Sequence, residues 1–94
     1  MYAAVRRYEG VTDAVEAGRL VAEGFVPLMR QVSGFVAYYW IDAGDGVMVS
    51  TSVFRDRAGA EESVSKATEF VRDHLASLLP NPPQVMSGQV LASA

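Results

Sequence analysis

The chain has 94 residues, the length of one small domain, and we expect residues 1–94 to fold as a single unit. It contains no cysteine, which excludes a disulfide framework and a thiolate metal site. The formal net charge is −3 and half of the residues are hydrophobic. This balance is typical of a globular domain and argues against a basic surface that binds nucleic acid.

We expect no membrane-spanning helix and no targeting segment. The uncharged run from Gln31 to Ile41 is much shorter than the roughly 20 apolar residues that a spanning helix needs. Near the N-terminus, Arg6 and Arg7 follow a short apolar stretch, which is the reverse of a signal peptide. The sequence therefore predicts a cytoplasmic protein that binds neither a membrane nor nucleic acid.

The first predicted element is a strand over residues 2–9. This segment is short, contains Val and Tyr, and is followed by Gly10. Asp13 then stands three residues before Glu16, which is the spacing of a capping box. We therefore expect Asp13 to begin a helix.

That first helix is predicted over about residues 13–32. Apolar residues recur there at steps of three and four, which is the period of one helical face. Pro27 lies inside the pattern and should kink the helix or break its last turn, because it lacks a backbone donor and crowds the carbonyl of Glu23. Gly34 should end the segment.

A β-hairpin is predicted next, with strands over residues 35–42 and 47–55. With Gly44 and Asp45 at the tip, each residue of the first strand pairs with the residue of the second strand for which the two residue numbers add to 89. One face of the hairpin would then carry Phe35, Ala37, Tyr39, Ile41, Met48, Ser50, Ser52 and Phe54. The other face would carry Val36, Tyr38, Trp40, Val47, Val49, Thr51 and Val53. A loop of another length would change this register.

A second helix over residues 57–79 and a last strand over residues 84–92 complete the chain. Asp56 is the expected helix cap, and Pro80 cannot continue the helix. Gly88 in the middle of the last strand suggests a bulge or a close approach of another chain segment.

The order β-α-β-β-α-β predicts an α+β fold, the ferredoxin-like plait, with a four-stranded antiparallel sheet and both helices on one face. Both faces of the predicted hairpin are apolar or aromatic, although only one face would be covered by helices. A bare apolar patch is unusual on a monomer, so we expect a homodimer that pairs sheet to sheet. Tyr38, Trp40 and Val49 are the predicted interface residues.

Two segments carry a family resemblance. Residues 33–38 (SGFVAY) follow the first helix, where the family often has Pro-Gly-aromatic-x-x-Tyr. Residues 49–56 (VSTSVFRD) resemble a family strand that ends in an aromatic residue followed by charge, and an Ala-rich acidic helix comes next. Over nearly its whole length the chain resembles the antibiotic biosynthesis monooxygenase-like, dimeric α+β barrel superfamily. That superfamily includes cofactor-free quinol oxygenases, haem-degrading enzymes, isomerases and small-molecule-binding modules.

The resemblance implies a ligand cavity between the helices and the sheet. On the predicted register, Tyr39, Ser50 and Ser52 face that cavity. Small residues leave room there and hydroxyl groups supply donors, as ligand sites require. In the alternative interpretation the two serines bond locally and Tyr39 only packs.

Arg6 is a further candidate for ligand binding. Arg6 and Arg7 are adjacent in a strand and therefore point to opposite faces of the sheet. A buried arginine needs a carboxylate or an anionic ligand. Arg6 also lies near the position at which haem-degrading members of the fold have a catalytic Asn. The alternative is an ion pair with Glu9 or Asp42.

His74 is the only histidine and lies on the second predicted helix. The haem-degrading members place an axial His on this helix, but their Asn and Trp partners are replaced by Arg6 or Arg7 and by Ser63. A lone His does not make a zinc site. We therefore expect no metal and no cofactor. His74 is either a solvated or helix-capping residue or a contact to the ligand.

Two functions follow from the resemblance. The first is a cofactor-free monooxygenase, or a related isomerase, that acts on a small aromatic or quinone-like substrate. Its site would use Tyr39, Ser50, Ser52, Arg6 and His74. The second is a non-catalytic dimeric module that binds a small planar apolar ligand or a protein partner, which the lack of an evident general base favours. The volume of the cavity should distinguish them.

Overall fold

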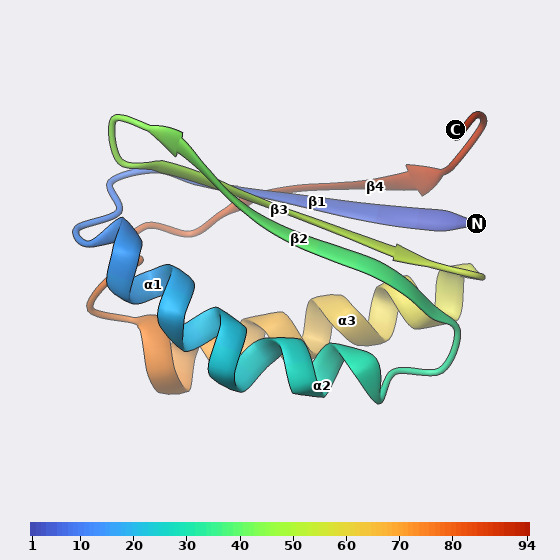
Figure 1. The fold of residues 1–94 in the computed structure, drawn as a ribbon, viewed down its shortest axis with the longest axis horizontal. Helices are drawn as coiled ribbons and strands as arrows, with labels where there is room; N and C mark the ends of the chain where they lie inside the picture. Colours follow the sequence, from blue (N-terminus) through green and yellow to red (C-terminus); the bar gives the residue numbers. More distant parts are fainter.

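The computed structural model describes residues 1–94. Its four strands are β1 (Tyr2–Tyr8), β2 (Phe35–Gly44), β3 (Val47–Phe54) and β4 (Gln84–Gln89). They form one antiparallel sheet in the order β2-β3-β1-β4, and the helices cover one face of it (Figure 1). The predicted four-stranded α+β plait is confirmed.

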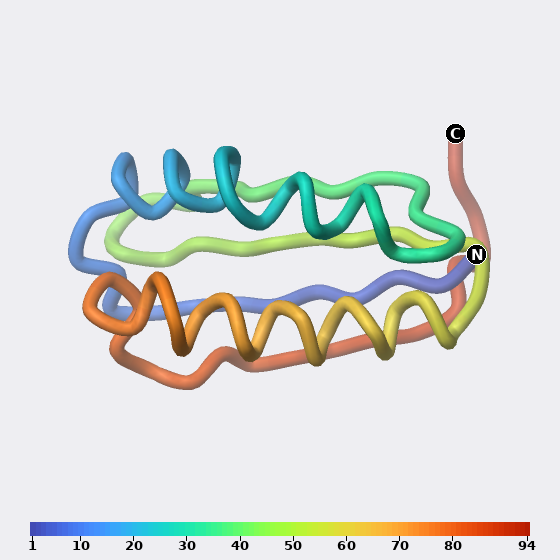
Figure 2. The backbone as a smooth tube through the Cα atoms, turned by 90° about the horizontal axis from the view of Figure 1, so that it is seen from below, coloured from blue at the N-terminus to red at the C-terminus, as the bar shows by residue number.

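Two helical rods lie side by side across that face (Figure 2). The first rod contains α1 (Ala14–Leu20), η1 (Val21–Phe25) and α2 (Val26–Arg30), and the second contains α3 (Arg57–Phe70) and η2 (Val71–Leu75). Asp13 caps the first rod, as predicted, because its Oδ1 accepts from the Glu16 N–H at 3.1 Å. Asp56 caps the second rod by accepting from the Gly59 N–H at 3.0 Å.

The first rod does not break at Pro27. Pro27 lies in the first turn of α2 and has no N–H to donate to the carbonyl of Glu23. The preceding turn, η1, is π-helical, and the Val26 N–H donates to the carbonyl of Val21. The wider π-helical turn accommodates the hydrogen bond that Pro27 cannot donate, and the helix continues.

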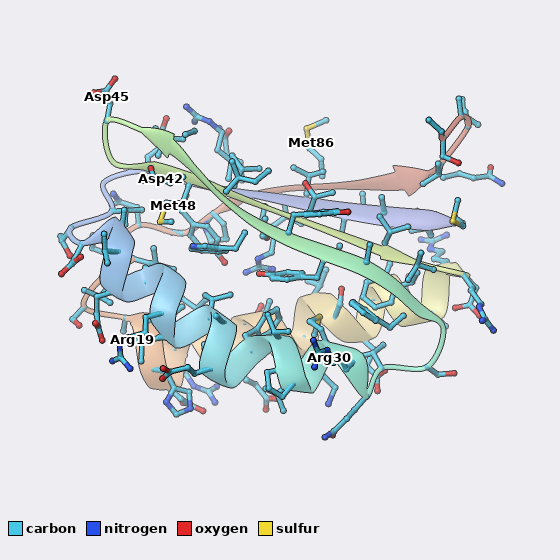
Figure 3. All side chains as sticks on the ribbon, in the orientation of Figure 1. Arg19, Arg30, Asp42, Asp45, Met48 and Met86 are labelled. Atoms are coloured by element: carbon cyan, nitrogen blue, oxygen red, sulfur yellow. The ribbon has the colours of Figure 1, made fainter.

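The hydrophobic core fills the layer between the rods and the sheet. Its largest fully buried side chains are Tyr8, Met29, Met48, Phe54 and Leu75. The opposite face of the sheet is uncovered, and Met86 stands out from it (Figure 3). None of the helices is both long enough and apolar enough to span a lipid bilayer.

The hairpin turns one residue later than predicted. Asp45 and Gly46 form its tip, and both have positive φ, 54° and 76°, as a two-residue type I′ turn requires. Gly44 pairs with the first residue of β3, but Ala43 is left without a partner before the pairing resumes at Asp42. This bulge shifts the register by one residue.

The shifted register shows that the predicted faces of β2 are wrong from Ala37 to Ile41, whereas Phe35 faces the helices as predicted. Tyr38 and Trp40 pair with Ser52 and Ser50, respectively, and therefore face the helices instead of the open side. Tyr39, which was predicted to face the helices, lies on the open side with 61% of its surface exposed. A shift of one residue reverses every side chain of a strand, which explains the error.

A second bulge at Val36 shifts the register again. Phe35 therefore pairs with Phe54 and faces the helices together with the aromatic residues further along the strand. Of the three predicted interface residues, Tyr38 and Trp40 lie on the helix side, and Val49 lies on the open face. The open face still carries exposed apolar side chains: Val5, Tyr39, Ile41 and Met86.

Candidate functional site

A small cavity lies between the sheet and the two helical rods. Sixteen residues line it, and twelve of them are hydrophobic. Its volume is about 20 Å³, which is room for about one water molecule. The polar groups at its wall come from Arg6, Tyr8, Tyr38, Trp40, Ser50, Ser52 and Ser63. The cavity is therefore small, mostly apolar and lined by several polar groups.

One row of paired residues crosses the floor of this cavity. Arg6 of β1 pairs with Ser50 of β3, and Ser50 pairs with Trp40 of β2. All three side chains share the helix-facing side, because directly paired residues lie on one face of a sheet. Neighbouring strands are about 4.8 Å apart. The small Ser50 is thus the base of a trough whose walls are the long side chains of Arg6 and Trp40.

Arg6 is buried without a carboxylate partner. Only 7% of its surface is exposed, and none of the five ion pairs in the structure includes it. Its Nε donates to the Tyr8 hydroxyl at 2.9 Å, and its guanidinium carbon lies 5.7 Å from the centre of the same ring. Burying a charge without an opposite charge is unfavourable. An anionic group in the cavity would compensate this cost.

The predicted ion pairs of Arg6 do not form. Glu9 pairs with Arg7, on the neighbouring position of the strand, and the Asp42 carboxylate accepts from the backbone N–H of Gly44 at 3.0 Å. Both carboxylates are therefore engaged elsewhere.

Trp40 holds a second unused donor. Its Nε1 is buried and has no hydrogen-bond partner, whereas the indole N–H of a buried tryptophan usually finds one. The ring packs at a tilt against Tyr8, with centroids 5.6 Å apart. This nitrogen lies against the first rod, because a Cβ placed on Gly18 would stand 4.0 Å from it.

The Tyr38 hydroxyl remains a neutral group in the cavity wall. Burial raises the pKa of Tyr38 far above its ordinary value, although the Ser50 hydroxyl and the Arg6 charge partly oppose this effect. Tyr38 consequently keeps its proton at neutral pH. It can donate a hydrogen bond there but cannot act as a base.

The cavity brings together three of the five predicted ligand-binding residues. Arg6, Ser50 and Ser52 line it, whereas Tyr39 is on the open face of the sheet and His74 lies outside. The Ser52 hydroxyl is close to the backbone, donating to the carbonyl of Ala4 at 3.4 Å.

Ser63 of α3 is a lining residue that the sequence prediction did not assign to the cavity. It is buried, and its hydroxyl donates to the carbonyl of Ala60 at 2.6 Å. The available signal was helical spacing, since Ser63 stands three residues after Ala60 and four before Ala67 on the apolar stripe.

His74 lies on the outer side of the helical layer. Its ring packs against Phe70 with centroids 4.8 Å apart, and both residues line two outer grooves. Phe70 also lines the inner cavity, so it borders that cavity and both grooves. No group of three His, Asp or Glu side chains is arranged to hold a metal ion.

No family model matches the chain, and no curated protein matches it by sequence. Several solved structures are similar. A protein of unknown function from Nitrosomonas europaea, NE2512, has 22% identity and a TM-score of 0.83, with 99% of this chain and 91% of that chain covered.

Two further structures are of oxygenases. The monooxygenase from the ActVA-Orf6 gene of Streptomyces coelicolor, in complex with the ligand Nanaomycin D, has 21% identity and a TM-score of 0.71, over 98% of this chain and 92% of that chain. SnoaB, a cofactor-independent oxygenase from Streptomyces nogalater, has 14% identity and a TM-score of 0.73, over 98% and 94%. At these identities the shared property is the fold. The chain therefore has the fold of antibiotic biosynthesis monooxygenases.

Proposed function

We propose that the chain is a cofactor-free monooxygenase that acts on a small planar aromatic or quinone-like substrate in the helix–sheet cavity. The observation that carries this proposal is the cavity lining, which is mostly apolar but places polar groups from β1, β2 and β3 on one floor. The similar fold of two oxygenase structures supports the same reaction class.

The reaction needs no cofactor when the substrate itself supplies the electrons. Loss of a proton from a phenol or an anthrone-like carbon gives an anion that is electron-rich enough to react with O₂. One oxygen atom enters the product and the other leaves as water, while the substrate carbon is oxidised from CH₂ to C=O. The protein would contribute binding, exclusion of water and stabilisation of the anion by Arg6.

Substrate binding must enlarge the cavity. Its volume is about 20 Å³, whereas ligand pockets usually measure about 300–1,000 Å³. Phe70 stands between this cavity and an outer groove of about 440 Å³. Rotation of that ring would join the two spaces, and π-helical turns flank it in both rods at Val21–Phe25 and Val71–Leu75. Such turns are frequent at functional sites.

A cytoplasmic homodimer completes the proposal. The open face of the sheet exposes Val5, Tyr39, Ile41 and Met86, with exposed fractions between 37% and 75%. A second copy would cover these side chains and remove their apolar surface from water. This face is opposite to the cavity, so each protomer would keep its own site.

A specific observation favours the second function, a non-catalytic ligand-binding module. No carboxylate and no histidine lines the cavity, and neither the Arg6 guanidinium nor the Tyr38 phenol can accept a proton at neutral pH. A catalyst would therefore rely on a substrate that is already acidic, or on water as the proton acceptor.

Oxygen consumption and ligand binding distinguish the two functions. Trp40 is the only tryptophan and lines the cavity, so its fluorescence should change when a planar aromatic molecule binds. Anthrones and hydroquinones should bind and should increase oxygen uptake above the uncatalysed rate. Binding without oxygen uptake would support the non-catalytic module, and the absence of both would contradict either function.

A matched pair of variants locates the site. Ser52→Val adds bulk to the cavity wall and removes a hydroxyl, whereas Thr51→Val removes a hydroxyl from the opposite face of the same strand without adding bulk. We expect Ser52→Val to weaken binding at least tenfold and Thr51→Val to leave it unchanged. Equal binding by both variants would show that the ligand lies elsewhere.

A further inference from the structure

We infer that ligands enter and leave the cavity between the two helical rods, at the contact of Phe70 with Gly24, and that the Phe70 ring sets the rate of this exchange. The route rests on the proposed function only in that the cavity binds a planar molecule. It makes Phe70 a gate residue, and it makes the outer groove lined by Leu20, Glu23, Gly24, Leu28, Phe70 and His74 the entrance.

Phe70 is the one residue that the cavity shares with either outer groove. Its ring has one neighbour on each side. Phe25 lines the cavity but neither groove, and its ring lies 5.4 Å from that of Phe70 between centroids. His74 lines both grooves but not the cavity, and its ring lies at 4.8 Å. At this point the cavity and the grooves are therefore one aromatic ring apart.

Gly24 of the first rod faces the edge of this ring without a side chain. A Cβ on Gly24 would stand 2.8 Å from both Cε1 and Cζ of Phe70, so the ring meets main-chain atoms of the opposite rod. Glycine also gives the main chain more conformational freedom than any other residue. The two rods, which lie side by side over the sheet (Figure 2), therefore touch here through one ring and one flexible position.

Both rods depart from the α-helix at the same contact. Gly24 belongs to the π-helical turn η1, and Phe70 is followed directly by the π-helical turn η2. Such turns are rare and are frequent at functional sites. Their coincidence on both sides of one ring places the movement at this contact and not at the ends of the rods.

The outer groove can hold a ligand before it passes the ring. Its volume is about 440 Å³, which is within the usual range of small-molecule pockets of about 300–1,000 Å³. Leu20, Leu28 and Phe70 give it an apolar lining, and Glu23 at its rim is exposed to water. A planar apolar molecule would therefore leave water in the groove and reach the cavity when the ring turns.

The test measures exchange rates with 1-aminoanthracene, a planar dye that does not react with thiols. Trp40 is the only tryptophan and lines the cavity, so energy transfer from Trp40 to the bound dye reports occupancy in a stopped-flow experiment. The chain has no cysteine, so a single cysteine variant can be labelled cleanly. Glu23→Cys receives a benzyl group, attached as a mixed disulfide, in the groove. Val15→Cys receives the same group at a position of α1 that is 84% exposed and lines neither groove.

An obstacle on the route slows arrival and departure equally, whereas an obstacle in the binding site weakens affinity. We expect the benzyl group at position 23 to lower the association and dissociation rates at least tenfold and to leave Kd unchanged. The same group at position 15 should change neither rate. Attached after the dye has bound, the group at position 23 should trap the dye in the cavity.

A second pair of variants tests the ring itself. Phe70→Leu should raise both rates several-fold, because the side chain at the contact becomes smaller. Val64→Ala removes bulk from a residue that lines the cavity but neither groove, and it should leave the association rate unchanged. If Phe70→Leu does not fold by circular dichroism, the two labelled proteins decide, since both carry their changes at exposed positions.

The outcomes separate the gate from the proposed reaction. Unchanged exchange rates in the labelled Glu23→Cys protein overturn the gate even if anthrones are oxidised. Slower exchange at unchanged Kd, without oxygen uptake, supports the gate and contradicts the oxygenase. If the dye does not bind to the unlabelled protein, both proposals are wrong.

Discussion

Gly24 lies directly against the ring of Phe70, so closely that no side chain fits between them. A Cβ placed on Gly24 would stand 2.8 Å from both Cε1 and Cζ of Phe70. Phe25 packs against the same ring at 5.4 Å and His74 at 4.8 Å between centroids. The missing side chain lets the two helical rods approach each other at the ring that closes the cavity.

Gly24→Ala should therefore destabilise the protein. Alanine favours a helix over glycine by about 1 kcal/mol, but overpacking against the Phe70 ring costs about 1–3 kcal/mol. Gly18→Ala is the matched control, because its Cβ would make an ordinary contact, 3.9 Å from Trp40 Cδ1. Guanidinium unfolding should show a lower free energy of unfolding for Gly24→Ala and a higher one for Gly18→Ala. Stabilisation by both changes would show that Phe70 yields freely.

The stability of the protein should depend on Tyr38 at alkaline pH. Unfolded tyrosine ionises at about pH 10, whereas burial raises the pKa of Tyr38 well above that value. The unfolded state therefore binds fewer protons than the folded state above about pH 10, and the free energy of unfolding falls as the pH rises. The contribution is fully present at neutral pH.

Urea unfolding of the wild type and of Tyr38→Phe at neutral and strongly alkaline pH measures this effect. The other tyrosines are common to both proteins, so their contributions cancel in the comparison. We expect the wild type to lose more stability than Tyr38→Phe as the pH rises. Parallel losses would mean that the Tyr38 hydroxyl ionises as freely in the folded protein as in the unfolded chain.

Tyr39→Asp should dissociate the proposed homodimer. Tyr39 is 61% exposed on the open face of the sheet, where an aspartate would bring an unpaired charge into the interface. Val15→Asp is the control, since Val15 is 84% exposed on α1, on the other side of the molecule. Sedimentation at micromolar concentration should give a dimer for the wild type and Val15→Asp, and a monomer of about 10.1 kDa for Tyr39→Asp. A monomeric wild type would refute the dimer.

Hemin should not bind through His74. The His74 ring packs on the outer side of Phe70 and does not line the cavity. Titration of hemin should give the same Soret spectra for the wild type and for His74→Ala. Tight one-to-one binding that the mutation removes, followed by haem turnover with a reductant, would contradict this prediction.

The order of the elements could be predicted because its signals are local. The helix caps at Asp13 and Asp56 and the period of the apolar residues depend on neighbours a few positions away, and the structure contains both caps. Strand alternation predicts that Arg6 and Arg7 face opposite sides of the sheet, but it does not say which of the two faces the helices. In the structure Arg6 faces the helices and is buried. The absence of a carboxylate partner for Arg6 could not be predicted, because it depends on the position of every acidic side chain in the folded protein.

The sequence by itself determined the strands, the helices and the excess of apolar residues on the hairpin. Only the tertiary structure decided which aromatic residues face the cavity. If the strands paired regularly from the Asp45-Gly46 turn, Tyr39 would face the helices as predicted. The Gly44–Val47 pair differs from the predicted register by two residues, and such a shift keeps every side chain on its face. The unpaired Ala43 adds a shift of one residue, which exchanges the two faces of the strand and places Trp40 on the helix side. A bulge of one residue has no clear local signal, because it forms where the packing of both faces of the strand favours it.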